Sequence, residues 1–108
     1  MKFPKPESGR TYIWFCHTES VIDDGPASRC RAILSDDERR AEIRFRFDED
    51  RRQYLLGHAM TRLLLADCLD CEPGSIDFSF NQFGKPEIAV PGETSLRFNL
   101  SHTRGMVV

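Results

Sequence analysis

The chain has 108 residues, 40% of them hydrophobic and 30% charged, which fits one compact domain with its own core and leaves no room for a second. Its formal net charge of -2 gives no broad attraction to nucleic acid or to an anionic membrane, so neither partner is expected. No stretch is apolar over the length of a membrane span, and the first ten residues lack the apolar run of a signal peptide, so a cytoplasmic protein is expected.

The first part of the chain predicts one strand followed by two helices. Residues 11–16, TYIWFC, are β-branched and aromatic, as strands often are. Beyond a break that contains glycine and proline, residues 27–34 (ASRCRAIL) favour a short helix. Ser35, with Glu38 three residues later, forms the capping-box pattern, so a second helix is predicted over about residues 36–45.

A third and longest helix is predicted to begin at the acids of residues 48–50, which suit the positive end of the helix dipole, and to continue to about Leu69. Its apolar residues recur at spacings of three and four and define the face expected in the core: Leu55, Leu56, Ala59, Met60, Leu63, Leu64 and Ala66. Arg51, His58 and Arg62 fall in one narrow sector beside that face. These three side chains either solvate the helix or face an anion.

The last third predicts a meander of short strands. In chain order the expected strands are IDFSF, EIAV, LRFNL and GMVV, with turns at NQFGKP and PGETS and with SHTR between or within the last two strands. An early strand, a helical middle and a final meander together indicate an α+β domain.

Arginines are concentrated between residues 39 and 62. Seven arginines there stand against four acids, a local excess of about +3 inside an acidic chain. A small, highly charged anion would fit this segment better than a long duplex. The other interpretation is a solvated helix face with Arg–acid pairs, and the composition leaves both open.

The four cysteines are expected to be reduced thiols in a cytoplasmic protein. Cys68 and Cys71 form the pattern C-L-D-C, which with Cys16 and His17 raises a zinc site as an alternative. There is no second C-x-x-C and no H-x-x-x-H, and the pair falls at the predicted end of the longest helix. Semi-buried thiols without a metal are therefore expected.

Two short motifs carry the residues best suited to binding chemistry. FGKP (Phe83 to Pro86) is a tight turn that offers a glycine backbone for close approach, a lysine charge and a rigid proline, although alone it also fits an ordinary hairpin turn. FNLSHT (98–103) places Ser101 next to His102, and neighbouring side chains of a strand point to opposite faces. Without an orienting acid, this pair is not expected to act as nucleophile and base.

Taken together and in this order, RRQYLLGHAMTRLLLADCL, IDFSFNQFGKP and LRFNLSHT resemble the N-terminal half of the 4'-phosphopantetheinyl transferases of the surfactin-synthetase-activating (Sfp) type. The resemblance covers about residues 34–108, and the pairing of GKP with FNLSHT makes it specific. It implies an α+β fold that is one half of a pseudo-dimer, with a small antiparallel sheet packed against a long helix and coenzyme A bound between the halves.

The resemblance further implies that residues 1–108 are the N-terminal subdomain of such a transferase and that the C-terminal half is absent. The apolar, β-prone run that closes the chain also indicates a piece of a longer protein.

These enzymes move 4'-phosphopantetheine from coenzyme A to a serine of an acyl or peptidyl carrier protein of fatty-acid, polyketide or nonribosomal-peptide biosynthesis, using Mg²⁺. The family's D-x-E magnesium ligands and its later W-x-x-K-E base would lie beyond Val108. No catalytic residue and no metal ligand are therefore expected in this chain, which alone should bind coenzyme A without turnover.

The resemblance also implies the cofactor-binding residues: Arg52, Phe83, Gly84, Lys85, Pro86, Ser101 and His102. The FGKP turn would lie against the adenine and ribose, and Ser101 and His102 would reach the phosphates, with His102 near the 3'-phosphate. The family's basic residue before x-L-L-G aligns with Gln53, and Arg52, one place earlier, is the candidate substitute. Upstream, positions that carry lysines in some members align with Glu38 and Ala41.

An alternative function is a non-catalytic module that self-associates or binds a partner. Half of a pseudo-dimer leaves uncovered the surface that faces its other half, and exposed apolar patches of this kind favour association.

Overall fold

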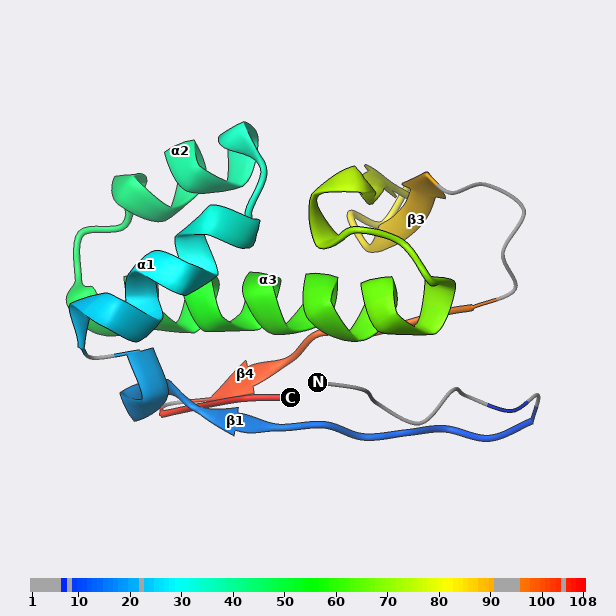
Figure 1. Cartoon of the computed structure of the whole chain (residues 1–108), viewed down its shortest axis with the longest axis horizontal. Coiled ribbons are helices and arrows are strands. Elements are labelled where there is room, and N and C mark those ends of the chain that lie inside the picture. The colour runs from blue at the N-terminus through cyan, green and yellow to red at the C-terminus, as the bar shows by residue number, and fades with distance from the viewer. Residues whose placement is uncertain (1–6, 8, 22, 91–95, 104) are drawn as a thin grey trace.

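One long helix, α3 (Asp48–Leu69), runs along most of the molecule, and the other elements pack on its sides (Figure 1). The computed structural model describes residues 7, 9–21, 23–90, 96–103 and 105–108. The elements before α3 are β1 (Cys16–His17), η1 (Thr18–Val21), α1 (Asp24–Ile33) and α2 (Asp36–Arg44). After it come η2 (Pro73–Ser75), β2 (Asp77–Phe80), β3 (Pro86–Val90), β4 (His102–Thr103) and β5 (Met106–Val107). The predicted α+β class is confirmed.

Two small antiparallel sheets flank α3. The first has the strand order β1-β5-β4, and in it Val107 faces Cys16 on one side and His102 on the other. Ser101 and Val108 extend this pairing with two backbone hydrogen bonds of 3.0 and 2.8 Å. The second sheet is the β2–β3 hairpin. In Figure 1 this hairpin, α1 and α2 lie above α3, whereas the first sheet lies below it.

Local signals set the helix boundaries. Ser35 Oγ accepts from the Glu38 backbone N–H, and the Glu38 carboxylate accepts from the Ser35 N–H, so the predicted capping box is formed. Helix α3 begins at its three acids and ends at Leu69, and the next residue, Asp70, adopts the left-handed conformation with φ 53°. The bounds predicted for all three helices are confirmed to within a few residues.

The core is built around the inward face of α3. Leu55 and Ala59 pack with α1, Leu56 packs on Val107 of the first sheet, and Leu65 and Ala66 pack on Ile76. The prediction for Leu63 was wrong: it is 41% exposed, and Leu65, at 5%, is buried instead. The reason is that Arg62 occupies the inward position on this turn, which turns Leu63 outward.

Of the predicted strands, one is shorter than expected and another forms no ladder among the described residues. Only Cys16 of residues 11–16 lies in β1, since β5 pairs with Cys16 and His17 alone; Ile13 and Phe15 are 75% and 60% exposed. Residues 96–100 form no ladder among the described residues, yet Leu96 and Phe98 pack on the cluster around Ile76. The turn predicted at 91–95 lies outside the described residues.

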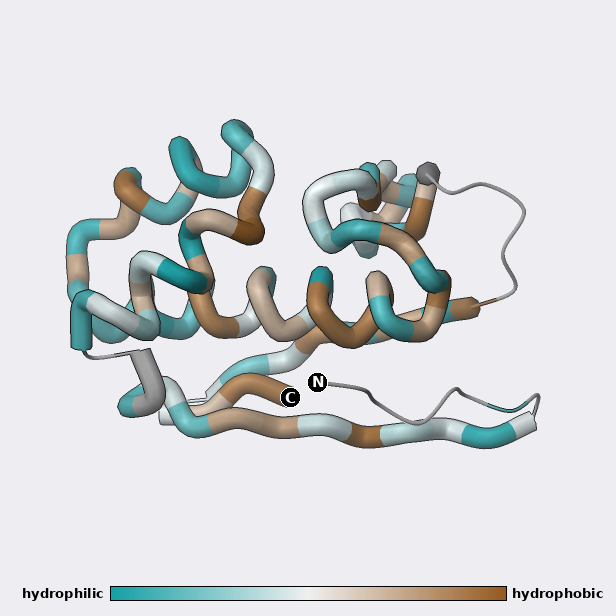
Figure 2. The backbone as a smooth tube through the Cα atoms, viewed as in Figure 1, coloured by the Kyte–Doolittle hydropathy of each residue, from teal (hydrophilic) through white to brown (hydrophobic). Residues whose placement is uncertain are grey.

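Polarity follows this arrangement. Helix α2 is mostly hydrophilic, whereas hydrophobic residues recur along α3 and along the extended segment that leads into β1 (Figure 2). No described helix is both long and apolar enough to cross a membrane.

Candidate functional site

The edge of α3 that carries Arg51, His58 and Arg62 lies against acids of the fold itself. Arg62 is only 3% exposed, and its Nε donates to Glu38 Oε1 at 2.6 Å. Its Nη1 donates to the carbonyl oxygens of Pro73 and Ile76, each at 2.8 Å. His58 Nδ1 lies 3.0 Å from Glu38 Oε2. The anion that His58 and Arg62 face is therefore Glu38, and Arg62 is a structural residue.

Glu38 is the centre of this cluster, which joins α2, α3 and the segment from Pro73 to Ile76. Burial by itself would raise the pKa of its carboxyl. The hydrogen bonds from His58, from the Ser35 backbone and from Arg62, together with the Arg62 charge, outweigh burial and lower that pKa to about 2. Both carboxylate oxygens are therefore committed to contacts that hold the fold together, and Glu38 is not available to a ligand.

Most arginines of the basic segment are also paired. The pairs Arg39–Asp36, Arg40–Asp37, Arg51–Asp48 and Arg52–Glu49 each join residues three apart on one helix. Arg46 stacks over Phe47, at 5.7 Å from the ring centroid. These contacts favour the solvated-face interpretation of the segment over a preformed basic site.

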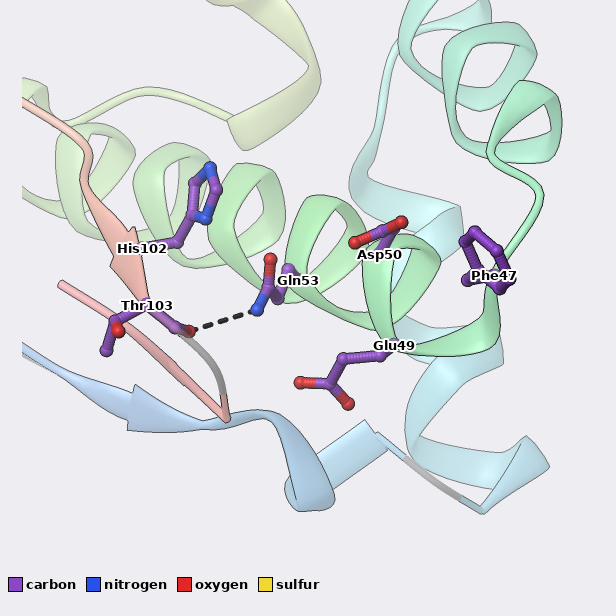
Figure 3. Close-up of a pocket in the computed structure, with 6 residues that line it drawn as sticks. All are labelled: Phe47, Glu49, Asp50, Gln53, His102 and Thr103. Carbon is purple, nitrogen blue, oxygen red and sulfur yellow. Dashed lines mark hydrogen bonds between the residues drawn. The ribbon is translucent and has the colours of Figure 1, made fainter.

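A hollow of about 500 Å³ lies between the first turns of α3 and strand β4. Figure 3 shows the residues that line it: Phe47, Glu49, Asp50, Gln53, His102 and Thr103. Gln53 Nε2 donates to the Thr103 carbonyl oxygen at 3.0 Å, which fixes β4 against the helix. His102 and Gln53 thus offer polar groups at one opening, and Asp50 adds an exposed carboxylate.

Glu49 connects the hollow to the turn between β4 and β5. Its Oε1 accepts from Thr18 Oγ1 and from the Gly105 backbone N–H, both at 3.1 Å, and its Oε2 accepts from Arg52 Nη2 at 3.3 Å. Desolvation alone would raise its pKa, but the hydrogen bonds from Arg52, Thr18 and Gly105 and the Arg52 charge lower it overall. The carboxylate is therefore ionised at neutral pH.

The FGKP motif forms the predicted turn between β2 and β3. Asn81 Oδ1 accepts from the backbone N–H groups of Phe83 and Lys85, at 2.9 and 3.0 Å. Gly84 has φ +79°, a conformation that favours glycine. Phe83 is 84% exposed, and Lys85 is exposed beside it, so the turn presents an aromatic ring and a cation on a well-braced backbone.

The structure does not bring all the predicted site residues together. His102 lines the hollow, and Ser101 is exposed next to His102. No residue of the FGKP turn lines the hollow. The two motifs lie on different sheets and on different sides of α3 (Figure 1). Arg52 pairs with Glu49, and its Nε is buried with no hydrogen-bond partner among the described residues. Gln53, not Arg52, donates to β4, at the Thr103 carbonyl oxygen, and lines the hollow together with His102. Convergence of the two motifs on one ligand stays a prediction.

Sequence reasoning missed the hydrogen bonds of Glu49 and Gln53 to the β4–β5 hairpin. The acids at the start of α3 are typical of a helix N-terminus, and that role alone accounts for an acid at Glu49 without any contact to a distant residue. The hydrogen bonds join residues 50 and 56 positions apart in the chain. No local pattern indicates contacts of that range.

The cysteines offer no metal centre in the described part of the chain, where no group of three or more His, Cys, Asp or Glu side chains is placed to hold an ion. Cys16 and Cys30 pack on the cluster of Leu56 and Val107, and Cys71 packs on the cluster of Ile76. Burial raises the pKa of the Cys16 and Cys30 thiols. They act as small core residues.

Comparisons with known proteins agree on one family. Residues 27–108 match the family model described as "4'-phosphopantetheinyl transferase, N-terminal". A phosphopantetheinyl transferase of Thraustochytrium is 35% identical over 79% of this chain and 30% of its own length. The 4'-phosphopantetheinyl transferase HetI of Nostoc is 33% identical over 97% of this chain and 46% of its own length. A Bacillus subtilis 4'-phosphopantetheinyl transferase is 28% identical over 89% and 42%. The chain thus spans less than half the length of each of these relatives.

Proposed function

Because this chain belongs to the 4'-phosphopantetheinyl transferase family, whose N-terminal region its residues 27–108 match, we propose that it forms the coenzyme A-binding part of such an enzyme. The enzyme transfers 4'-phosphopantetheine from coenzyme A to a serine of an acyl or peptidyl carrier protein in the cytoplasm. The observation that carries the proposal is the family match over a region that includes both FGKP and FNLSHT.

The chemistry of the two motifs supports coenzyme A as the ligand. Phe83 is an exposed ring on a braced turn, which suits stacking against an adenine, and Lys85 adds an ammonium for a phosphate. His102 borders the hollow at the start of α3, where a protonated imidazole can donate to a phosphate oxygen. The Ser101 hydroxyl, exposed next to it, is a further donor.

The acids beside His102 limit the affinity. Asp50 lines the same hollow as an exposed carboxylate, and Arg52 is engaged by Glu49. A phosphate at His102 therefore meets two nearby carboxylates, of which only Glu49 is paired with an arginine, and no unpaired arginine from this turn of α3. We expect weak binding in which the 3'-phosphate contributes part of the affinity.

Magnesium, which the family uses, finds no fitting donor set in the described residues, so no step of the reaction is assigned to a metal here. When bound, the metal would offset negative charge that develops on the pyrophosphate.

Calorimetry of the chain against coenzyme A and its 3'-dephospho form tests the proposal. We expect coenzyme A to bind several-fold more tightly than the dephospho form, and His102→Ala to remove most of that difference. Equal affinity of the unchanged chain for the two ligands would contradict the role of His102. No binding of either would contradict the proposed function.

A second candidate, a self-associating or partner-binding module, has its own observation. Ile13 and Phe15 are strongly exposed on the segment that leads into β1, an edge strand of its sheet. Exposed apolar side chains beside an unpaired strand edge favour association. Light scattering over a concentration series should then show a mass that rises with concentration, and Phe15→Ser should reduce it. A constant monomer mass would dismiss this candidate.

A further inference from the structure

The Glu49 carboxylate joins three segments that are distant in the chain, and we infer that Glu49 is the positioning residue for the His102 side of the ligand site. The inference rests on the proposed function, because it concerns how a phosphate-binding imidazole is held. Glu49 also lines the hollow, but its carboxylate oxygens are engaged by Thr18, Gly105 and Arg52, so it acts through the β4–β5 hairpin that carries His102.

The contacts form a closed ring. Oε1 of Glu49 accepts from Thr18 Oγ1 and from the Gly105 N–H, and the Thr18 N–H donates to the Gly105 carbonyl oxygen at 2.9 Å. Thr18 is buried, and Gly105 has φ +83°, a turn conformation that favours glycine. One carboxylate oxygen thus ties η1, α3 and the β4–β5 turn to a single point.

The hairpin depends on this anchor because it is short. Strands β4 and β5 have two residues each, and β5 pairs with only two residues of β1, so this small sheet is marginal without contacts from other elements. Helix α3 holds it at two points one helical turn apart: Glu49 holds Gly105, and Gln53 holds the Thr103 carbonyl. His102 directly precedes Thr103, so these two contacts set where its backbone lies.

The neighbouring acid provides a matched comparison. Asp50 also lines the hollow and is exposed, but its carboxylate makes no hydrogen bond or ion pair with the side chain or backbone of another described residue. Figure 3 shows Glu49 directed toward the β4–β5 turn and Asp50 directed away from it. Both carry one negative charge near His102, so substituting each in turn separates an effect of charge from an effect of anchoring.

The test compares Glu49→Ala, Glu49→Gln and Asp50→Ala in the 108-residue chain. Calorimetry measures the ratio of affinities for coenzyme A and 3'-dephospho-coenzyme A, at a temperature where circular dichroism shows each variant folded. Glu49→Ala should remove most of the several-fold preference for coenzyme A, because hydrogen bonds to a charged group are lost. Glu49→Gln keeps an oxygen for Thr18 and Gly105 and should retain the preference within about twofold. Asp50→Ala should leave the preference equal or raise it.

A purely structural role would weaken both ligands equally and leave the ratio unchanged. If Glu49→Ala keeps the preference of the unchanged chain, the inference is overturned and the proposed function stands. If the unchanged chain shows no preference, the ligand role of His102 fails, and with it the role of Glu49 in ligand binding. Hydrogen exchange of the Gly105 amide then decides the anchoring alone: faster exchange in Glu49→Ala supports it, and an unchanged rate overturns it.

Discussion

Two glutamates of this molecule, Glu38 and Glu49, each bind several donors, yet they lie in opposite settings. Glu38 is buried between α2 and α3 and binds Arg62, which is itself buried. Glu49 has a side chain about one-third exposed, at the edge of the hollow beside His102. The difference teaches that the arginines of α3 serve two purposes. Arg62 closes the core through Glu38, and Arg52 helps to shape an open surface through Glu49.

The largest effect should come from the closed cluster. Arg62→Ala leaves the Glu38 carboxylate and two carbonyl groups without their buried donor, and we expect a loss of about 3–5 kcal/mol in the free energy of unfolding. Urea denaturation measures this loss. Arg40→Ala, which removes an exposed pair with Asp37, is the control and should cost less than about 1 kcal/mol. Similar losses for both variants would contradict the contrast between buried and exposed arginines.

The same cluster predicts how stability depends on pH. The pKa of Glu38 is about 2 in the fold, against 4.5 for the free side chain, so its contribution is present above pH 4.5 and is lost as pH falls toward 2. The shift corresponds to about 3 kcal/mol. Urea denaturation across this range should show a steeper acid loss for the unchanged chain than for Glu38→Gln. Parallel curves for the two proteins would rule out this role of Glu38.

The open region predicts a gain of affinity. Gln53→Arg places a cation beside His102 and keeps a donor for the Thr103 carbonyl oxygen, so coenzyme A should bind several-fold more tightly, with the gain falling as salt rises. Ala32→Arg, on the exposed surface of α1, adds the same charge away from the hollow and should change the affinity little. Calorimetry at low and high salt makes the comparison. An equal gain in both variants would mean that net charge, not position, sets the affinity.

The smallest effect concerns the packing of α3 against the β4–β5 hairpin and the residue just before it, Leu100. A Cβ on Gly57 would meet Leu100 Cδ2 at 3.4 Å and Val107 Cγ1 at 3.6 Å, ordinary contact distances. Since alanine is about 1 kcal/mol better than glycine inside a helix, Gly57→Ala should be neutral or stabilise the fold by up to about 1 kcal/mol. Thermal unfolding checks this. A loss of stability would show that the hairpin needs a closer approach than these distances indicate.

The sequence predicted what local chemistry decides. The capping box at Ser35, the long helix after the acids of residues 48–50 and the glycine turn at Gly84 all follow from residues a few positions apart. The resemblance drawn from FGKP and FNLSHT predicted the family, and the family match confirmed it.

Contacts between distant residues could not be predicted in the same way. Arg62 carries a surface-type side chain and is buried because Glu38, 24 residues earlier, supplies its counter-charge. Glu49 and Gln53 donate to or accept from the β4–β5 hairpin, at residues 56 and 50 positions further along the chain. Residues 11–15 have strand-forming composition, but a strand also needs a partner, and the described part of β5 pairs only with Cys16 and His17.

An NMR titration of the chain with coenzyme A most directly tests whether one ligand engages both motifs. Saturable shifts in the amide signals of Phe83, Gly84 and Lys85, together with those of Ser101 and His102, and with one common dissociation constant, are the result we predict. Shifts confined to one of the two motifs, or different constants for the two, would show that they do not share a ligand.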